Sequence, residues 1–326
     1  MKTAVVAVVK NEIDIIDVFL DHVVSCFDFV YLCDNFSSDG TYEKLLEKAT
    51  HTDKIRLFRL KSKSFIQSAL VSFLVNTCFS LEDPDVIFML DADEFLPFPD
   101  AASLKVCLKL LDTELIYMHW DNMVLDHEGR LVTAPPYRSK ISKVAIFRAV
   151  KKKFGRIRVD NGNHNIKRSR RLQSVISSFP LLHMPIRSEA QLMKKLIIGN
   201  VALIMNRDNI GFHLKMLGEY CFDNIPRIDE IALKYALRYG ENIDLNEILA
   251  TDLNSLQRIG GEVAWLESLL ATKVTILQND CYKQIFDAVM HCNRVTSGKQ
   301  DGILYDVAGN IVNVFTTSFI TRIRQL

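Results

Sequence analysis

The sequence predicts an α/β protein with a mostly parallel sheet and flanking helices. Over residues 1–100, short apolar segments alternate with segments whose apolar residues recur at helical spacing. One of the apolar segments, Val86 to Leu90, has no polar position, as expected of a central strand covered on both faces. Strands that alternate with helices of this length form right-handed βαβ units, and such units build a parallel sheet.

The elements of this first part are expected in a regular order. Thr3 to Val9 reads as a buried strand, and the segment 13–27 follows with its apolar residues on one helical face. Strands are also predicted at 29–33, 55–60 and 86–90, and helices at 42–49, 65–79 and 103–111. Between the second strand and its helix, residues 34–41 are turn formers that end in a cap for the helix.

The pattern changes after residue 111. Strands are predicted at 115–120, 142–149 and 156–159, and the longer polar loops between them suggest a mixed edge to the sheet. From Glu189 onward, helices are expected at 191–205, 227–239, 245–253 and 262–271. The last segment, 311–326, fits a core helix, a strand or a membrane-surface helix, with core packing as the default.

Length and composition indicate a folded protein of about two domains. The chain has 326 residues, of which 48% are apolar and 24% charged, and this composition excludes disorder. Its seven cysteines are far apart and form no Cys-x-x-Cys pair, which favours buried thiols in a reducing compartment. We find neither a signal-peptide pattern nor an apolar run of about 18 residues, so a cytoplasmic location without a membrane span is expected.

Three carboxylates follow the apolar strand 86–90 directly. Asp91, Asp93 and Glu94 lie within four positions, at the end of the strand where ligands collect in open α/β sheets. Carboxylates this close repel each other unless a cation is present, and hard oxygen ligands suit a divalent ion. The alternative is that they are turn residues that cap the helix near Ala102.

Polar residues also follow the first two strands. Lys10, Asn11 and Glu12 come after one, and Asp34 and Asn35 come after the other. They offer donors and acceptors suited to a base and a ribose, although Asn11 and Asp34 fit a helix-capping role equally well. No Gly-x-Gly-x-x-Gly or Walker sequence follows the first strand, and this absence argues against a dehydrogenase or an NTPase.

The segment between Arg130 and Arg171 is strongly basic. It contains fourteen Lys or Arg residues and a single acidic residue, Asp160. The segment is either a solvated loop face or a surface that attracts a pyrophosphate, an acidic membrane surface or nucleic acid. Nucleic acid is disfavoured because aromatic residues are not interleaved for base stacking.

Two histidines stand at the ends of predicted elements. His164 closes the polar turn that begins at Asp160, and His183 ends the apolar run 181–182. A single histidine is more often structural than functional. Two of them downstream of Asp91 and Asp93 make a metal ligand or an acid–base group plausible for one.

Several of these segments together resemble family 2-like glycosyltransferases with the GT-A fold, in the branch common in bacterial surface-polysaccharide loci. The matching segments are Val9-Lys10-Asn11-Glu12, Asp34 to Thr41, Asp91 to Phe95, Gly162-Asn163-His164 and His183 to Ser188. The resemblance covers about residues 1–205. It implies a glycosyltransferase domain at 1–205, with a nucleotide-sugar half at 1–100 and an acceptor half at 101–205, followed by a mainly helical region at 206–326.

The family implies a nucleoside-diphosphate-sugar donor, commonly a UDP-sugar, whose pyrophosphate is held by Mn2+ or Mg2+. By this likeness Asp91 contacts ribose or metal, Asp93 binds the metal, and His183 is a further metal ligand, with His164 as its alternative. Asp34 or Asn35 faces the uracil, and Lys10, Asn11 and Glu12 line the nucleotide site. Arg187, Lys194 and Lys195 add positive charge near the leaving group.

The resemblance also implies a saccharide or lipid-linked saccharide acceptor and inversion at the anomeric carbon, which requires a base for the acceptor hydroxyl. The usual Glu-Asp pair is missing, and Asp160, His164 and Glu189 are the candidates for this base. The basic segment is expected near the inner face of the cell membrane. The alternatives are a sugar-phosphate nucleotidyltransferase, whose glycine-rich N-terminal loop is missing here, and a catalytically silent nucleotide-sugar binding or scaffold protein.

Overall fold

The chain folds into two compact units. The computed structural model describes residues 1–62, 67–134, 139–196, 217, 220, 228–241, 244–260, 263–273 and 302–315. Unit 1 comprises residues 1–119, 142–181 and 299–326, and unit 2 comprises residues 120–141 and 182–298. The predicted domain boundary at residue 205 lies outside the described residues, so that domain division stays a prediction.

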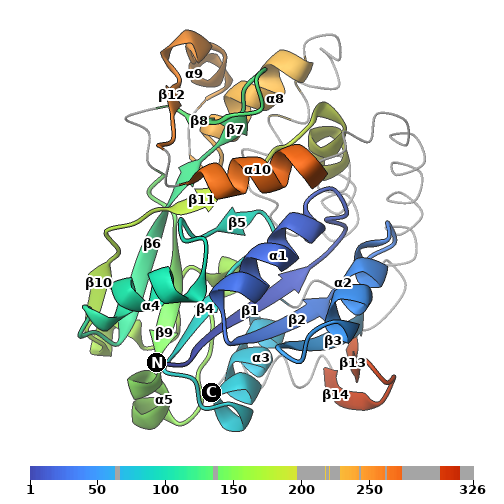
Figure 1. The fold of residues 1–326 in the computed structure, drawn as a ribbon, viewed down its shortest axis with the longest axis vertical. Coiled ribbons are helices and arrows are strands. Elements are labelled where there is room, and N and C mark those ends of the chain that lie inside the picture. The colour runs from blue at the N-terminus through green and yellow to red at the C-terminus, as the bar shows by residue number, and fades with distance from the viewer. Residues whose placement is uncertain are drawn as a thin grey trace. The chain divides into compact units, whose positions relative to one another are not determined.

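Unit 1 is built on a large sheet (Figure 1) whose strands follow the order β14-β13-β3-β2-β1-β4-β9-β6, with β10 paired to β6. Neighbours among β3, β2, β1 and β4 are parallel, whereas β9, β6, β13 and β14 add antiparallel edges. This confirms the predicted α/β class with its mixed edge. The strands are β1 (Thr3–Val9), β2 (Phe29–Asp34), β3 (Ile55–Ser62), β4 (Val86–Met89), β5 (Glu94–Phe95), β6 (Leu115–Asn122), β9 (Ser142–Phe147), β10 (Ser174–Ile176), β13 (Gly302–Asp306) and β14 (Ile311–Phe315).

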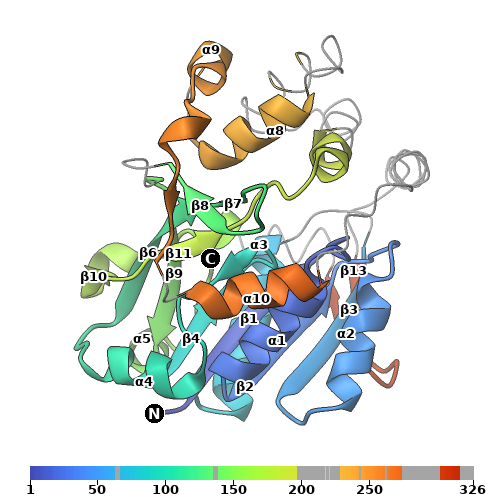
Figure 2. The same cartoon turned by 45° about the horizontal axis from the view of Figure 1, so that its top comes forward.

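Helices cover both faces of this sheet (Figures 1 and 2), with α1 and α2 on one face and α3 on the other. This double cover is why β1 and β4 are apolar at almost every position and buried at every position except Val8. Against α3, Leu70, Leu74 and Cys78 pack on Val6 and Ile87. The helices of unit 1 are α1 (Ile16–Cys26), α2 (Thr41–Thr50), α3 (Gln67–Leu81), α4 (Ala101–Lys109), α5 (Arg148–Phe154) and the short 3-10 helices η1 (Asn161–Asn163) and η2 (Ser169–Arg171).

The predicted strand at 156–159 is wrong. Its backbone is bonded to side chains of α3 and not to a neighbouring strand. Asn76 donates to the Ile157 carbonyl at 2.7 Å and accepts from the Ile157 N–H at 3.0 Å. Ser72 accepts from the Val159 N–H at 2.8 Å, and Ser68 donates to the Val159 carbonyl at 2.5 Å. The segment is therefore tied to a helix, and only an isolated bridge joins Val159 to Ile166.

Two further elements differ from the expectation. The strand predicted at 142–149 ends at Phe147, and Arg148 begins α5, because the next residues are basic and favour a helix. Of the three possibilities for the segment 311–326, its first part is a strand: β14 pairs with β13, and β13 pairs antiparallel with β3. Residues 316–326 lie outside the described residues.

Unit 2 combines a small antiparallel sheet with helices, of which α8, α9 and α10 confirm three predicted ones. Leu192, Leu217, Ile231, Tyr235 and Ile248 belong to its core. Residues 189–196 are helical, and the rest of the helix predicted at 191–205 lies outside the described residues. The elements are β7 (Val124–Leu125), β8 (Leu131–Thr133), β11 (Leu181–His183), β12 (Gln257–Arg258), α8 (Ile228–Leu237), α9 (Leu245–Leu249), the 3-10 helix η4 (Leu253–Ser255) and α10 (Ala264–Lys273).

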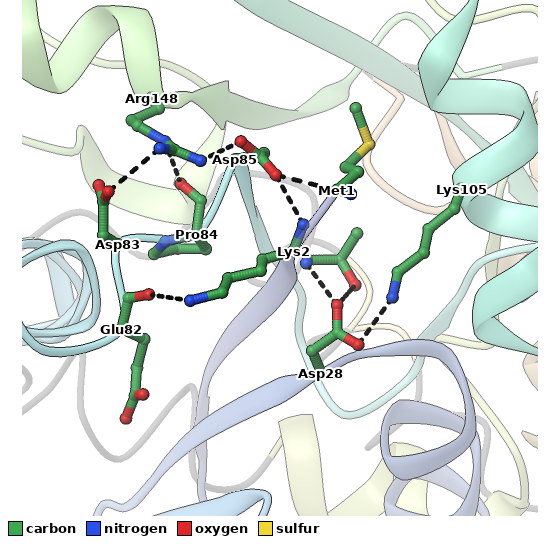
Figure 3. A network of polar contacts seen from close by, with 10 residues as sticks. Met1, Lys2, Asp28, Glu82, Asp83, Pro84, Asp85, Lys105 and Arg148 are labelled. Carbon is green, nitrogen blue, oxygen red and sulfur yellow. Dashed lines mark hydrogen bonds and ion pairs between the residues drawn. The ribbon is translucent and has the colours of Figure 1, made fainter.

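Ion pairs and hydrogen bonds hold the edge of unit 1 at which β1 and β4 begin (Figure 3). The Lys2 N–H donates to Asp85 at 2.6 Å, and Arg148, the first residue of α5, also pairs with Asp85. Asp28 accepts the Thr3 N–H at 2.8 Å and the Lys105 ammonium at 2.7 Å. This network fixes α4 and α5 to the same edge of the sheet.

In the part of the chain that the structure describes, no helix is both long and apolar enough to cross a membrane. The described cysteines Cys26, Cys33, Cys78 and Cys107 are free thiols, and the first three are buried. Burial raises the pKa of the Cys26 thiol to about 12, so this thiol is protonated at neutral pH.

Candidate functional site

The polar residues that follow β1, β2 and β4 lie at one edge of the sheet of unit 1. The register pairs Val9 with Asp34, so β1 and β2 end together, and it pairs Val6 with Met89, so β4 ends three residues earlier at the same edge. The Leu90 N–H still bonds to the Val6 carbonyl at 3.2 Å. Because these strands are parallel, the segments 10–12, 34–35 and 91–94 all leave from this edge, as the sequence predicts.

Asp91 and Glu94 meet a buried lysine at this edge. The ammonium of Lys143, on β9, contacts Asp91 Oδ2 and lies 3.3 Å from Glu94 Oε1. The other Glu94 oxygen accepts the Asp91 N–H at 2.8 Å. Lys143 and Glu94 are buried, whereas the Asp91 side chain is 31% exposed. Asp91 therefore presents its carboxylate to solvent from a position that two buried partners fix.

Burial and neighbouring charges shift the pKa values of Glu94 and Lys143. Burial, and then the negative charges of Asp91 and Asp93, raise the pKa of Glu94 to about 8 in spite of the nearby Lys143 ammonium. Burial opposes the charge of Lys143, but the carboxylates of Asp91 and Glu94 outweigh it and raise the pKa of Lys143. Lys143 stays charged, and three carboxyl groups share this one ammonium.

The loop that contains η1 reaches the same place. Asn163 is buried, and its Nδ2 lies 3.4 Å from Asp91 Oδ1. Its backbone is left-handed, with φ +60°, and its Oδ1 has no hydrogen-bond partner among the described residues. A strained backbone and an unmatched acceptor in one residue both cost stability, and such residues cluster at functional sites.

His164 follows Asn163 and lies near the same carboxylates. Its Nδ1 is 2.8 Å from the Ser142 carbonyl, an acceptor, so Nδ1 carries the proton and donates it. Burial lowers the pKa of His164, and the Lys143 charge lowers it further, against the opposite effects of the Ser142 bond and of Asp91. The ring is therefore neutral at pH 7. Asp160, at the start of this loop, pairs instead with Lys167 at 2.8 Å.

The loops after β1 and β2 are bonded to each other. Asn11 has a left-handed backbone, with φ +56°, and its N–H donates to Ser37 Oγ at 2.9 Å. Asn11 Oδ1 accepts the Ser38 N–H at 2.9 Å, and the Glu12 N–H donates to Thr41 Oγ1 at 2.9 Å. Lys10 and Asn11 are half-buried. Asn11 thus holds two loops together rather than capping a helix.

Asp34 and Asn35 are buried. Asp34 accepts the Ser37 N–H at 3.2 Å and lies 3.4 Å from the Arg59 guanidinium. Burial raises the pKa of Asp34 in spite of these partners. The Asn35 N–H donates to the Val9 carbonyl at 2.8 Å. Asp34 therefore holds a turn, and the contact of either residue with a base stays a prediction.

The other candidate residues belong to unit 2. His183 is buried; its Nδ1 lies 2.7 Å from Asn122 Oδ1, and its ring stacks on Trp120 with centroids 4.1 Å apart. These contacts are those of a structural histidine. Within the described ranges, no three His, Cys, Asp or Glu side chains gather as they would to hold a metal ion. The role of His183 as a metal ligand stays a prediction.

Arg187 and Lys195 bond to nearby carbonyl groups of unit 2. Arg187 donates to the Met184 carbonyl at 3.2 Å, and Lys195 donates to the Pro185 carbonyl at 2.7 Å. Glu189 is exposed at the start of the helical residues 189–196. Their places beside a leaving group or an acceptor are therefore predictions that the described geometry leaves open.

Sequence reasoning missed Lys143 and Asn163 as site residues. Lys143 had a signal in the sequence, since it is the only charged residue of the strand 142–147 and four apolar residues follow it. Asn163 lies in a recognised motif, but its buried, left-handed conformation has no signature in the sequence beyond the preceding Gly162.

Solved structures of similar shape include two complexes with nucleotide sugars. One is a mannosyltransferase from Pyrobaculum calidifontis in complex with GDP-Man and Mn2+, at 14% identity and a TM-score of 0.41, over 90% of this chain and 86% of that chain. Another is S. aureus TarS 1–349 in complex with UDP-GlcNAc, at 12% identity and a TM-score of 0.37, over 90% of this chain and 91% of that chain. No protein-family model and no curated protein matches the chain.

Proposed function

We propose that the protein is a glycosyltransferase that moves a sugar from a nucleoside-diphosphate-sugar, a UDP-sugar in the first instance, to a saccharide or lipid-linked saccharide. The observation that carries the proposal is the group formed by Asp91, Glu94, Lys143 and Asn163 at the edge where β1, β2 and β4 end. In sheets of this kind, ligands bind outside the carboxyl ends of the strands. The family resemblance adds inversion and a role in surface polysaccharide synthesis to the proposal.

The donor set at this edge fits Mn2+ or Mg2+. The pKa of Glu94 is raised to about 8, so this group is mostly protonated at pH 7, but Asp91 and Asp93 face the single ammonium of Lys143 and leave negative charge for a second cation. Mg2+ in particular is held in many enzymes by one or two carboxylates together with substrate phosphates, without a cage of protein ligands. Asp91 and Asp93 would hold the ion, which when bound supplies positive charge for the leaving diphosphate.

The other residues of the group have roles that follow from their contacts. Lys143 fixes the Asp91 carboxylate against Glu94, so donor binding need not order it. His164 is the best placed of the three candidate bases, because its Nδ1 proton is held by Ser142 and its neutral ring accepts a proton at Nε2. A hydroxyl of the acceptor would lose its proton to this nitrogen while its oxygen bonds to the anomeric carbon, and the bond from that carbon to the diphosphate oxygen would break, releasing the nucleoside diphosphate.

Calorimetric titration of the purified protein with UDP and GDP, each with and without Mn2+, tests the proposal. We expect one nucleotide to bind, and to bind more tightly with Mn2+. The Asp93→Asn variant should lose the Mn2+-dependent part of the affinity while its unfolding curve stays close to wild type. Absence of binding to either nucleotide, or an unchanged Mn2+ effect in the variant, contradicts the proposal.

A further inference from the structure

The basic segment of the sequence forms an exposed surface on unit 1 that the proposed chemistry does not use. Between Arg148 and Ile176 there are ten Lys or Arg residues and one acidic residue, Asp160. Arg148 is paired with Asp85, and Lys167 with Asp160. We define the basic surface by its remaining exposed cations: Lys152, Lys153, Arg156, Arg168, Arg170 and Arg171.

Contacts between α5 and η2 make these residues one surface. The Lys153 ammonium at the end of α5 donates to the Arg171 carbonyl at 2.8 Å. The Arg168 guanidinium lies 5.9 Å from the centre of the Phe154 ring. Positive charge from α5 and from the segment around η2 therefore gathers in one place. Among the described residues, only Lys153 of these six cations has an ion pair, with Glu114.

The basic surface lies at the opposite edge of the sheet from the candidate site. β9 runs antiparallel to β4, with Phe147 paired to Val86. Its first residues therefore adjoin Asp91, whereas α5 begins beside the start of β4, where Arg148 meets Asp83 and Asp85. Because the donor would bind at the other edge, a donor pyrophosphate is not the anion that this surface attracts.

Exposed aliphatic side chains lie on α4 and β10, the elements that flank the segment 111–114 and the residues after η2. Leu110, just beyond α4, is 83% exposed, Val106 one turn earlier is 65% exposed, and Ile176 on β10 is 67% exposed. Gln173, three residues before Ile176, donates to the Asp112 carbonyl at 3.2 Å, which joins β10 to the end of α4. No aromatic side chain is exposed in the described residues of this region. Stacking with nucleic-acid bases is therefore disfavoured.

We propose that this face of unit 1, made of the basic surface with Val106, Leu110 and Ile176, docks on a membrane that contains anionic lipid. Cations attract the negative headgroups, and each Lys or Arg near such a surface adds to the affinity. Exposed aliphatic side chains gain by entering the boundary between headgroups and acyl chains. The network that holds α4 and α5 to one sheet edge keeps both parts of the face in place (Figure 3).

Sedimentation of the full chain with sucrose-loaded vesicles tests the proposal. The vesicles are phosphatidylcholine alone, or phosphatidylcholine with phosphatidylglycerol, each at low and high salt. We expect binding to the anionic vesicles only, and weaker binding at high salt. Arg170→Gln/Arg171→Gln should lower the partition coefficient roughly 10-fold to 30-fold. Neither arginine side chain makes a hydrogen bond or an ion pair with another described residue, so the fold should be unaffected.

Two further variants separate this face from general charge. Lys44→Gln/Lys140→Gln removes the same charge from elsewhere on the surface and should bind vesicles like wild type. Ile176→Ser should weaken binding several-fold, most visibly at high salt. The proposal is overturned by absence of binding to anionic vesicles, by equal losses in the two double variants, by unchanged binding of Ile176→Ser, or by preferential binding of duplex DNA through Arg170 and Arg171. Nucleotide titration is a separate measurement, so the proposed function is tested independently of vesicle binding.

Discussion

The ammonium of Lys143 lies 3.3 Å from a carboxylate oxygen of Glu94, and both side chains are buried at the edge of the sheet where Asp91 is presented. The buried ammonium requires Glu94 and Asp91 around it, because alone it would carry the full cost of desolvation. The pair therefore links the stability of unit 1 to the geometry of the candidate site.

Replacement of Lys143 by Met should destabilise the protein strongly. The change leaves Glu94 buried and Asp91 without its main partner, and loss of one member of a buried pair costs about 3–5 kcal/mol. Urea unfolding followed by circular dichroism measures the effect. Lys167→Met is the matched control: it breaks the exposed pair with Asp160 and should cost less than about 1 kcal/mol. Similar losses in the two variants would contradict the role given to Lys143.

Asn76→Ala should loosen the segment 156–159. Both the N–H and the carbonyl of Ile157 lose their partner in α3, and buried backbone groups without partners cost about 1–3 kcal/mol each. Hydrogen exchange at the Ile157 amide should accelerate more than at β1. Ser80→Ala is the control, since Ser80 is exposed and bonds only within its own helix, to the Asn76 carbonyl. Unchanged exchange at Ile157 would show that the segment is held by other contacts.

His22 should make the protein sensitive to acid. Burial lowers the pKa of His22 from 6.5 to about 3, and its Nε2 accepts the Leu96 N–H at 3.1 Å. The unfolded chain then binds more protons than the folded one between these values, so stability is present above pH 6.5 and is lost as pH falls toward 3. At about 1.4 kcal/mol per pH unit, the loss between pH 6.5 and 4.5 is roughly 2–3 kcal/mol.

Unfolding free energies of wild type and His22→Leu, measured across this range, check the sign. The variant should be less stable at pH 7, because Leu96 loses its acceptor, but its stability should decline less on acidification. His51→Gln changes an exposed histidine, and its unfolding free energy should fall with decreasing pH as it does in wild type. Parallel curves for wild type and His22→Leu would rule out this histidine as the source.

The sheet could be predicted because strands that are buried on both faces are uninterrupted apolar segments in the sequence. The expected strand Thr3 to Val9 matches β1 exactly, and the helices are right to within a few residues. The segment 156–159 has the same local pattern as a strand, and only the tertiary fold decides that its hydrogen bonds go to α3. A local pattern specifies an extended backbone but not its partner.

The site could be predicted only in part, for a related reason. Asp91 and Asp93 follow a strand whose direction is known, so their edge of the sheet could be named in advance. Lys143 meets them because the antiparallel pairing of β9 with β4 sets Ala145 against Phe88, two residues from Lys143. That pairing joins segments more than fifty residues apart in the sequence, and no local spacing encodes it.

Gly162→Ala should displace His164. A Cβ at this position would lie 2.5 Å from His164 Nε2 and 2.6 Å from its Cδ2, and the backbone is left-handed with φ +74°. The ring must move, which breaks its alignment with Ser142. Gly129→Ala is the matched control, because its φ is +75° and nothing lies within 4 Å of the new methyl group. Both variants carry the backbone cost of about 1 kcal/mol, and only Gly162→Ala adds overpacking of about 1–3 kcal/mol.

The two glycine variants also separate stability from function. Imidazole NMR signals of His164 should shift in Gly162→Ala and stay in place in Gly129→Ala. If His164 takes the acceptor proton, transfer or hydrolysis of the nucleotide sugar should fall at least 10-fold in the first variant at temperatures where both are folded. Equal activity in the two variants would remove His164 from the reaction and return Asp160 and Glu189 as candidate bases.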